Sequence, residues 1–225
     1  MVFHKPRCRM PQNIPTFKIN NTNISQVKHF NFLGIIIDET LSWTPHCERI
    51  ALKIGKMSGI LNRIKRVVPP NALRTLYFSM VNSHLNYGVL IWGFTPHRLF
   101  KLQKRIIRII TCSKYNAHTE PLFKSMNILK LEDLLKLNAL KFYHKFIHER
   151  CPDYFHSFNF TRQNQIHSYH TRQSNMIRTT FTRTLYADKC LRMYLPNLIN
   201  STPESIISNL PTMSINCLKD HIKRL

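Results

Sequence analysis

The stretch HFNFLGIIIDETLSWTPHCERI, residues 29–50, joins an apolar, strand-like run directly to the start of a helix. Its first half predicts a strand, with Gly34 at a bulge or at a close backbone approach. Thr44 followed by Pro45 predicts a helix start, with Thr44 as N-cap and Pro45 in the first helical position. Upstream, the adjacent asparagines of INNTN (residues 19–23) favour a turn between short strands. The N-terminal part therefore predicts a short β-hairpin that leads into a helix.

Most of the remaining sequence predicts helices. After Thr44, apolar residues at steps of three and four form one stripe, and basic residues lie on another side of the same helix. Further helices are expected from Pro70 or Asn71, from Thr95–Pro96, and over residues 131–149. Beyond Cys151–Pro152 the periodicity weakens, and residues 152–180 predict a loop or linker. The predicted fold class is therefore α+β, dominated by helices. The apolar stripe consists of Ile50, Ile54, Met57, Leu61 and Ile64.

The charge of the 225-residue chain is strongly unbalanced. It has 33 Lys and Arg residues against 11 Asp and Glu, a formal net charge of +22. Residues 49–119 contain no acidic residue, although thirteen basic ones occur there. A soluble surface usually mixes both signs, because neighbouring like charges repel each other. This imbalance indicates a polyanionic partner such as nucleic acid or a membrane surface.

A membrane span and a secreted protein are both disfavoured. Residues 75–97 are uncharged and long enough to cross a bilayer, but polar residues such as Asn82, His84 and Asn86 favour a buried helix instead. The six cysteines form no CxxC pair, and the N-terminus shows no secretory signal. Reduced thiols in an intracellular compartment are the expected state.

No catalytic or metal site is predicted. His144 and His148 have a spacing on a predicted helix that can ligate zinc, but a third ligand is not evident. His167 and His170 in the predicted loop are weaker candidates. Asp38 and Glu39 favour turn formation over acid–base catalysis.

Several blocks, in order, resemble one family. The segment FNFLGIIIDETLSWTPH is similar to the region where non-LTR (LINE or jockey-like) retrotransposon reverse transcriptases pass from palm to thumb. The similarity continues to the C-terminal end of such polymerases, and MVFHK at the N-terminus resembles their last palm motif. The later blocks are residues 53–93, 102–110, 118–134, 169–181, 198–206 and 214–225.

The resemblance implies a division of the chain and a set of nucleic-acid contacts. Residues 1–43 would be the end of the palm with the primer-grip hairpin, residues 44–115 a helical thumb, and residues 116–225 a mostly helical post-thumb region. Phe32, Leu33 and Gly34 would form the primer grip, where glycine lets the backbone approach the primer. Basic residues on two helices would follow template–primer phosphates, about six to ten of them. These are Lys53, Lys56, Arg63, Lys101, Lys104, Arg105 and Arg108.

The resemblance also implies what the chain lacks. Family members polymerise with palm carboxylates that hold two Mg²⁺ ions, one pair of them in a Y-x-D-D turn upstream of FLG. That turn is absent here. The YADK segment at residues 186–189 does not replace it, because Lys189 stands in place of the second acid. Met1 is expected to be an internal methionine of a longer frame. The chain alone is therefore expected to be inactive and to carry no cofactor. Its expected partners are RNA template, DNA primer and the missing palm and fingers, in the nucleus or a cytoplasmic ribonucleoprotein.

Other interpretations stay open. Relatives usually show Trp-Asn-x-Leu-Pro where this chain has residues 199–203, and Leu218 stands where they often have Phe. The chain can therefore be a decayed relic without function, a stand-alone basic RNA-binding module, or an enzyme of another kind. The aromatic residues Tyr87, Trp92 and Phe94 can stack on bases, although their apolar neighbours favour packing in the core.

Overall fold

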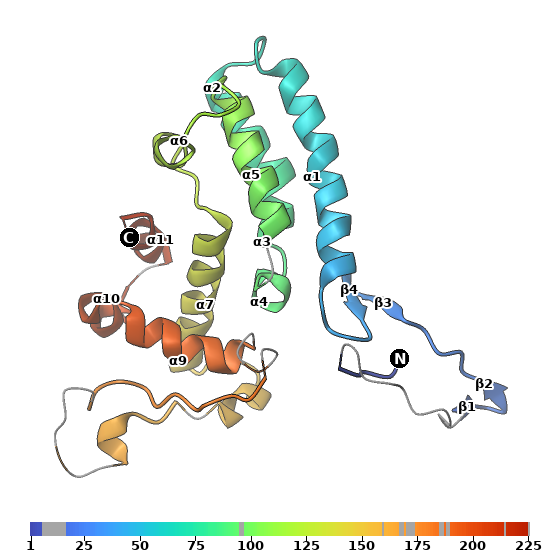
Figure 1. Cartoon of the computed structure of the whole chain (residues 1–225). Helices are drawn as coiled ribbons and strands as arrows, with labels where there is room; N and C mark the ends of the chain where they lie inside the picture. Colours follow the sequence, from blue (N-terminus) through green and yellow to red (C-terminus); the bar gives the residue numbers. More distant parts are fainter. Residues whose placement is uncertain are drawn as a thin grey trace.

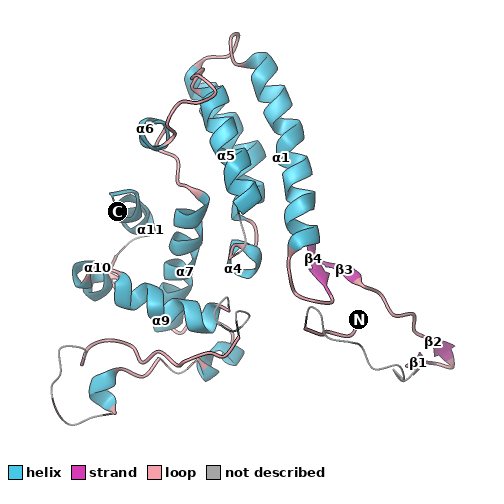
Figure 2. Ribbon diagram, viewed as in Figure 1, coloured by secondary structure: helices cyan, strands magenta, loops and turns pink. Residues whose placement is uncertain are grey.

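The computed structural model has an α+β fold dominated by helices, as predicted (Figures 1 and 2). Two small antiparallel hairpins lie on the far side of α1 from α7 (Figure 1). The structure describes residues 1–5, 17–94, 97–158, 160–166, 169, 174–184, 187, 190–213 and 215–224. The helices of the first half are α1 (Thr44–Ile64), α2 (Pro70–Tyr77), the π-helical turn η1 (Phe78–Asn82), α3 (Ser83–Asn86), α4 (Val89–Trp92) and α5 (His97–Ile110). Those of the second half are α6 (Glu120–Ser125), α7 (Leu131–Ile147), the 3-10 turns η2 (Asp153–Ser157) and η3 (Gln163–Gln165), α9 (Leu191–Ser201), α10 (Glu204–Asn209) and α11 (Ile215–Arg224).

Each hairpin reverses through two residues with positive φ. Strand β1 (Lys18–Ile19) pairs with β2 (Thr22–Asn23), so the turn predicted at the adjacent asparagines is confirmed. Strand β3 (His29–Phe32) pairs with β4 (Ile35–Asp38). The bulge expected at Gly34 is wrong: Leu33 (φ 48°) and Gly34 (φ 83°) form the two-residue turn of this hairpin. Two-residue turns with positive φ at both positions match the twist of paired strands. Leu33 and Gly34 together therefore reverse the chain between β3 and β4.

The carboxylate of Asp38 holds the connection between β4 and α1. It accepts hydrogen bonds from the Thr40 hydroxyl and from the backbone N–H groups of Ser42 (3.0 Å) and Trp43 (2.9 Å). Burial raises the pKa of Asp38, but these hydrogen bonds outweigh burial, and the pKa lies below its ordinary value. Asp38 therefore forms a turn, as the sequence indicated. The predicted N-cap was one residue too late, because α1 already includes Thr44 and Trp43 precedes it in the left-handed conformation.

Helix α1 buries Ile50, Ile54 and Leu61 of the predicted stripe, half-buries Met57 and Ile64, and lies beside α5 (Figure 1). Residues 70–92 connect α1 to α5 in sequence. The single buried helix expected over residues 75–97 is wrong, because a π-helical turn and a break at Tyr87–Gly88 divide the stretch into short helices. The predicted start of α5, at residues 95 and 96, lies outside the described residues. No helix in the described part of the chain combines the length and the apolar character that a membrane span needs.

The second half packs onto the first through α7. The helix predicted over residues 131–149 is confirmed, because α7 spans Leu131–Ile147. Helix α7 contacts α4, α9 and α11. Between α7 and α9, the described residues of the predicted loop contain η2, η3 and an isolated bridge between Arg162 and Ile177. One hydrophobic core extends from α1 to α11. The expected boundary at residue 115 therefore falls inside a continuous core, and the three regions remain a division by resemblance.

Candidate nucleic-acid interface

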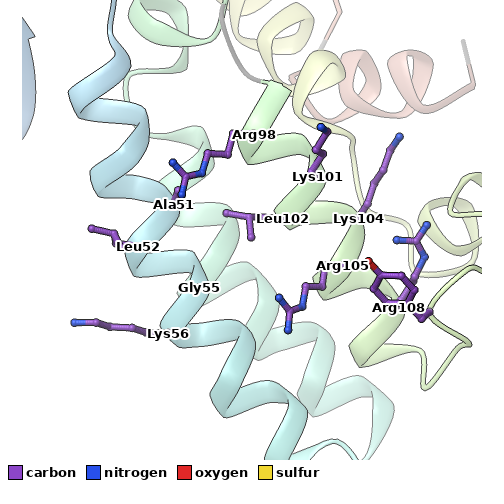
Figure 3. A pocket seen from close by; sticks show the side chains of 11 residues that line it. Ala51, Leu52, Gly55, Lys56, Arg98, Lys101, Leu102, Lys104, Arg105 and Arg108 are labelled. Atoms are coloured by element: carbon purple, nitrogen blue, oxygen red, sulfur yellow. The ribbon is translucent and has the colours of Figure 1, made fainter.

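A groove of about 800 Å³ lies between α1 and α5 (Figure 3). Six cationic side chains line it, and none of its described lining residues is acidic. The other lining residues are apolar or small, apart from one tyrosine. The lining residues are Ala51, Leu52, Gly55, Lys56, Arg98, Lys101, Leu102, Lys104, Arg105, Arg108 and Tyr115.

Helix α5 supplies five of the six cations because they follow one helical spacing. Residues 98, 101, 105 and 108 are three or four positions apart, and Lys104 lies beside them, so all five side chains leave the same side of the helix. The opposite side carries Leu99, Ile106 and Ile107, which are completely or almost completely buried. Apolar residues thus fix the helix against the core and leave the cations on the side that borders the groove. Arg98 and Arg105 extend toward α1, whereas Lys101 and Lys104 extend away from it (Figure 3). Like charges at this spacing destabilise a helix, so a bound anion would relieve their repulsion.

Three of these cations are oriented by contacts within the protein. The Nε–H of Arg108 donates to the carbonyl of Ala117 at 2.9 Å, which uses one of the five N–H donors of the guanidinium. The ammonium of Lys104 lies 4.2 Å from the ring centre of Phe100. Arg98 Nη1 lies 3.9 Å from a carboxylate oxygen of Glu48, and both side chains are largely exposed. An exposed ion pair of this kind contributes little, so the groove stays strongly positive.

The α1 wall is built from small and apolar residues together with Lys56. Ala51 and Gly55 bring the α1 backbone close to the groove surface, while Leu102 points toward α1 from the other helix (Figure 3). The ammonium of Lys56 points away from α5 in the same view. The floor between the two helices is therefore apolar, and the cations stand along its α5 rim.

The structure brings together five of the seven residues predicted to contact phosphates. Lys56, Lys101, Lys104, Arg105 and Arg108 line the groove. Lys53 and Arg63 are exposed on α1 but do not line it. Sequence reasoning did not single out Arg98 or Tyr115. The helical spacing that selects Lys101 and Arg105 extends back to Arg98, whereas a loop tyrosine carries no periodic signal.

The predicted primer-grip residues lie at the tip of the second hairpin, apart from the groove lining. The side chains of Phe32 and Leu33 are exposed. The Tyr87 hydroxyl donates to the Leu33 carbonyl at 2.6 Å, which ties the turn to the helical part of the molecule. The φ of 83° at Gly34 explains why glycine stands at this position. Its role at a primer stays a prediction.

Of the three aromatic residues, two belong to the core. Trp92 is completely buried and donates its indole N–H to the Tyr87 carbonyl at 2.9 Å. Phe94 packs edge-on against Tyr194, with ring centres 5.1 Å apart. Core packing is therefore confirmed for both, while the Tyr87 side chain is more than half exposed.

The histidines offer no metal centre in the part of the chain that is described. The rings of His144 and His148 are tilted at 57° to each other with centres 4.5 Å apart, and His148 Nε2 lies 2.9 Å from the Pro211 carbonyl oxygen. Among the described residues, no three His, Cys, Asp or Glu side chains gather in a way that could hold a metal ion. His167, His170 and all of YADK except Ala187 lie outside those residues.

Compared with protein-family models, with curated proteins and with solved structures, the chain matches none.

Proposed function

We propose that the groove between α1 and α5 binds the sugar–phosphate backbone of nucleic acid, and that the chain is the C-terminal part of a non-LTR reverse transcriptase. In this role it grips RNA template and DNA primer while a palm supplies the carboxylates for polymerisation. The observation that carries the binding function is the row of cations on α5, which borders a groove whose described lining residues include no acid. The ordered sequence blocks support the polymerase origin.

The chemistry of the groove favours contacts with phosphate over reading of bases. Lysine and arginine bind phosphate oxygens at any sequence, and such contacts position a strand without specifying its sequence. Each neutralised phosphate releases counterions, so affinity falls steeply as salt rises. We therefore expect sequence-independent, strongly salt-dependent binding.

A salt titration with two charge-matched variants tests this function. Lys101, Lys104 and Arg105 are replaced together by alanine, and affinity for a fluorescent oligouridylate is measured by anisotropy over a range of salt. We expect the slope of log affinity against log salt to become shallower by about two to three, because roughly three phosphate contacts are lost.

The matched control replaces Lys124, Lys145 and Arg150, which are exposed and do not line the groove. It removes the same charge, so a general loss of electrostatic attraction would affect both variants equally. Equal slopes for the two triple variants would sink the assignment of the groove.

The polymerase origin has a separate test, because a stand-alone RNA-binding module would pass the salt titration too. Genomic DNA and transcript are sequenced 5′ of the Met1 codon and read in frame. An uninterrupted frame that encodes a Y-x-D-D turn supports the polymerase. Stop codons or unrelated sequence there would favour the binding module or a relic.

A further inference from the structure

Tyr115 stands at one end of the groove with its side chain open to solvent. It lines the groove together with Arg108, and the residue is 87% exposed. Burying a tyrosine ring is favourable in a folded protein, since its π-face and carbon framework are apolar. An aromatic ring that borders a cationic groove is therefore available to a ligand with a flat, apolar face.

The backbone under Tyr115 is fixed by several hydrogen bonds. Just beyond the end of α5, Cys112 has the left-handed conformation (φ 51°), and the backbone N–H of Ser113 donates to the Arg108 carbonyl at 2.9 Å. This pattern is the Schellman motif of helix ends. Tyr115 is then the second residue of a turn closed by the Ala117 N–H and the Lys114 carbonyl (3.0 Å).

Arg108 connects this turn to the groove. Its guanidinium donates to the Ala117 carbonyl, the last residue of the turn, while the same side chain lines the groove. The position of the tyrosine is thus coupled to the row of cations. A ring presented on an ordered turn loses little conformational entropy when a ligand stacks on it.

The combination of a cationic row and an exposed ring matches single-stranded nucleic acid. Proteins that bind single strands pair a positive groove along the backbone with aromatic rings on which bases stack. In a duplex the faces of the bases are covered by neighbouring base pairs, so an internal base has no free face to offer. Arg98 and Arg108 are ten residues apart, about 15 Å along the helix, so the row of cations can follow a short run of phosphates.

We propose that the groove holds an unpaired stretch of the template or primer strand, outside the part in which the two are paired, and that an unpaired base stacks on Tyr115. This inference rests on the proposed nucleic-acid function and names the form of its ligand. The cations hold the phosphates, and the tyrosine adds an affinity that requires a base.

The experiment separates the base from the backbone. Binding of the full chain to three fluorescent probes is measured by anisotropy: an oligouridylate, an abasic sugar–phosphate oligomer of equal length, and a blunt duplex. The wild-type chain is expected to bind the oligouridylate about ten-fold more tightly than the abasic oligomer, the size of one base–aromatic stack. Tyr115→Ala is expected to remove that difference, and Tyr115→Phe to preserve it because the ring remains.

Phe181 provides a matched control, since it is 93% exposed and does not line the groove. Phe181→Ala is expected to bind all three probes as the wild-type chain does. Equal binding of oligouridylate and abasic oligomer by the wild-type chain, or an unchanged preference in Tyr115→Ala, would overturn the stacking proposal. Tighter binding of the duplex than of the oligouridylate would overturn it too. In each of these cases the triple variant of α5 still tests the groove, and failure of the wild-type chain to bind any probe overturns both proposals.

Discussion

His46 is a buried histidine with one ring nitrogen satisfied and the other not. Its Nδ1 accepts the backbone N–H of Ile36 in β4 at 3.2 Å, and its ring packs edge-on against Trp92 of α4. The Nε2 atom is buried and has no hydrogen-bond partner among the described residues. Since Nδ1 accepts a hydrogen bond, the neutral ring carries its proton on Nε2. Protonation of Nδ1 would remove the acceptor for the Ile36 N–H of the hairpin.

Acid should weaken that connection. Burial lowers the pKa of His46, and the nearby charges of Arg49 and Lys53 lower it further. The folded pKa therefore lies below the unfolded value near 6.5. The stabilisation is complete above about pH 6.5 and is lost as pH falls toward the folded pKa, by at most about 1.4 kcal/mol per pH unit. We expect the melting temperature to fall between about pH 7 and pH 5 by more in the wild-type chain than in His46→Phe, measured by circular dichroism.

The phenylalanine variant keeps the ring against Trp92 and removes the titrating nitrogen. Burial also lowers the pKa values of His84 and His144, but both residues are present in both proteins, so their contributions cancel. The same drop in melting temperature for both proteins would show that His46 is not the group responsible.

Helix α1 contains two glycines that its packing does not require. Apart from the nearby backbone of α1 itself and the neighbouring residues, a Cβ atom built on Gly55 or on Gly59 meets no atom of the described residues within 4 Å. Glycine in a helix interior costs about 1 kcal/mol relative to alanine. Both positions therefore lower the stability of α1 without a packing reason, but Gly55 lines the groove and Gly59 does not.

Replacing each glycine by alanine should separate stability from binding. Both variants are expected to unfold at higher denaturant, with a gain of about 0.5–1 kcal/mol. We expect only Gly55→Ala to bind oligouridylate more weakly, by roughly five-fold or about 1 kcal/mol, because its methyl group occupies the groove floor. Unchanged affinity in Gly55→Ala would mean that the strand does not approach the α1 backbone.

Periodic elements could be predicted from the sequence, and the contacts between them could not. The stripe of α1 and the extent of α7 follow from apolar spacing, which reports the buried face of a helix directly. The turn at Leu33–Gly34 was misjudged because an unbroken apolar run does not mark where a chain reverses. The packing of α1 against α5 decides which lysine of α1 lines the groove. Lys56 lines it together with Arg105, and Lys53 does not. Tyr115 belongs to no periodic pattern and becomes informative only through the turn that presents it.

The residues expected to form the thumb depend on hydrogen bonds with the region that follows them. The buried side chain of Gln103 in α5 donates to the Tyr77 hydroxyl (2.9 Å) and to the Leu129 carbonyl (3.0 Å), and accepts the Leu131 N–H (3.0 Å). Arg74 Nε donates to the Met126 carbonyl at 2.8 Å. All of these bonds except the one between Gln103 and Tyr77 cross the expected boundary at residue 115. Without the second half, the buried amide oxygen of Gln103 would lose its partner, at a cost of about 1–3 kcal/mol.

A chain ending at residue 115 should therefore fail to fold cooperatively. It lacks α7, whose buried residues include four leucines between positions 131 and 137, and burial of each such side chain contributes roughly 1.5–3 kcal/mol. That loss alone is comparable to the 5–15 kcal/mol by which native domains are typically stable. We expect residues 1–115 to melt without a sharp transition and to bind a hydrophobic dye. Deleting residues 18–23 instead removes β1, β2 and their turn, whose residues are exposed and whose strands pair only with each other among the described strands, and should leave the melt almost unchanged. A cooperative melt of residues 1–115 would show that these residues form an independent domain and that the continuous core is not needed to form the groove.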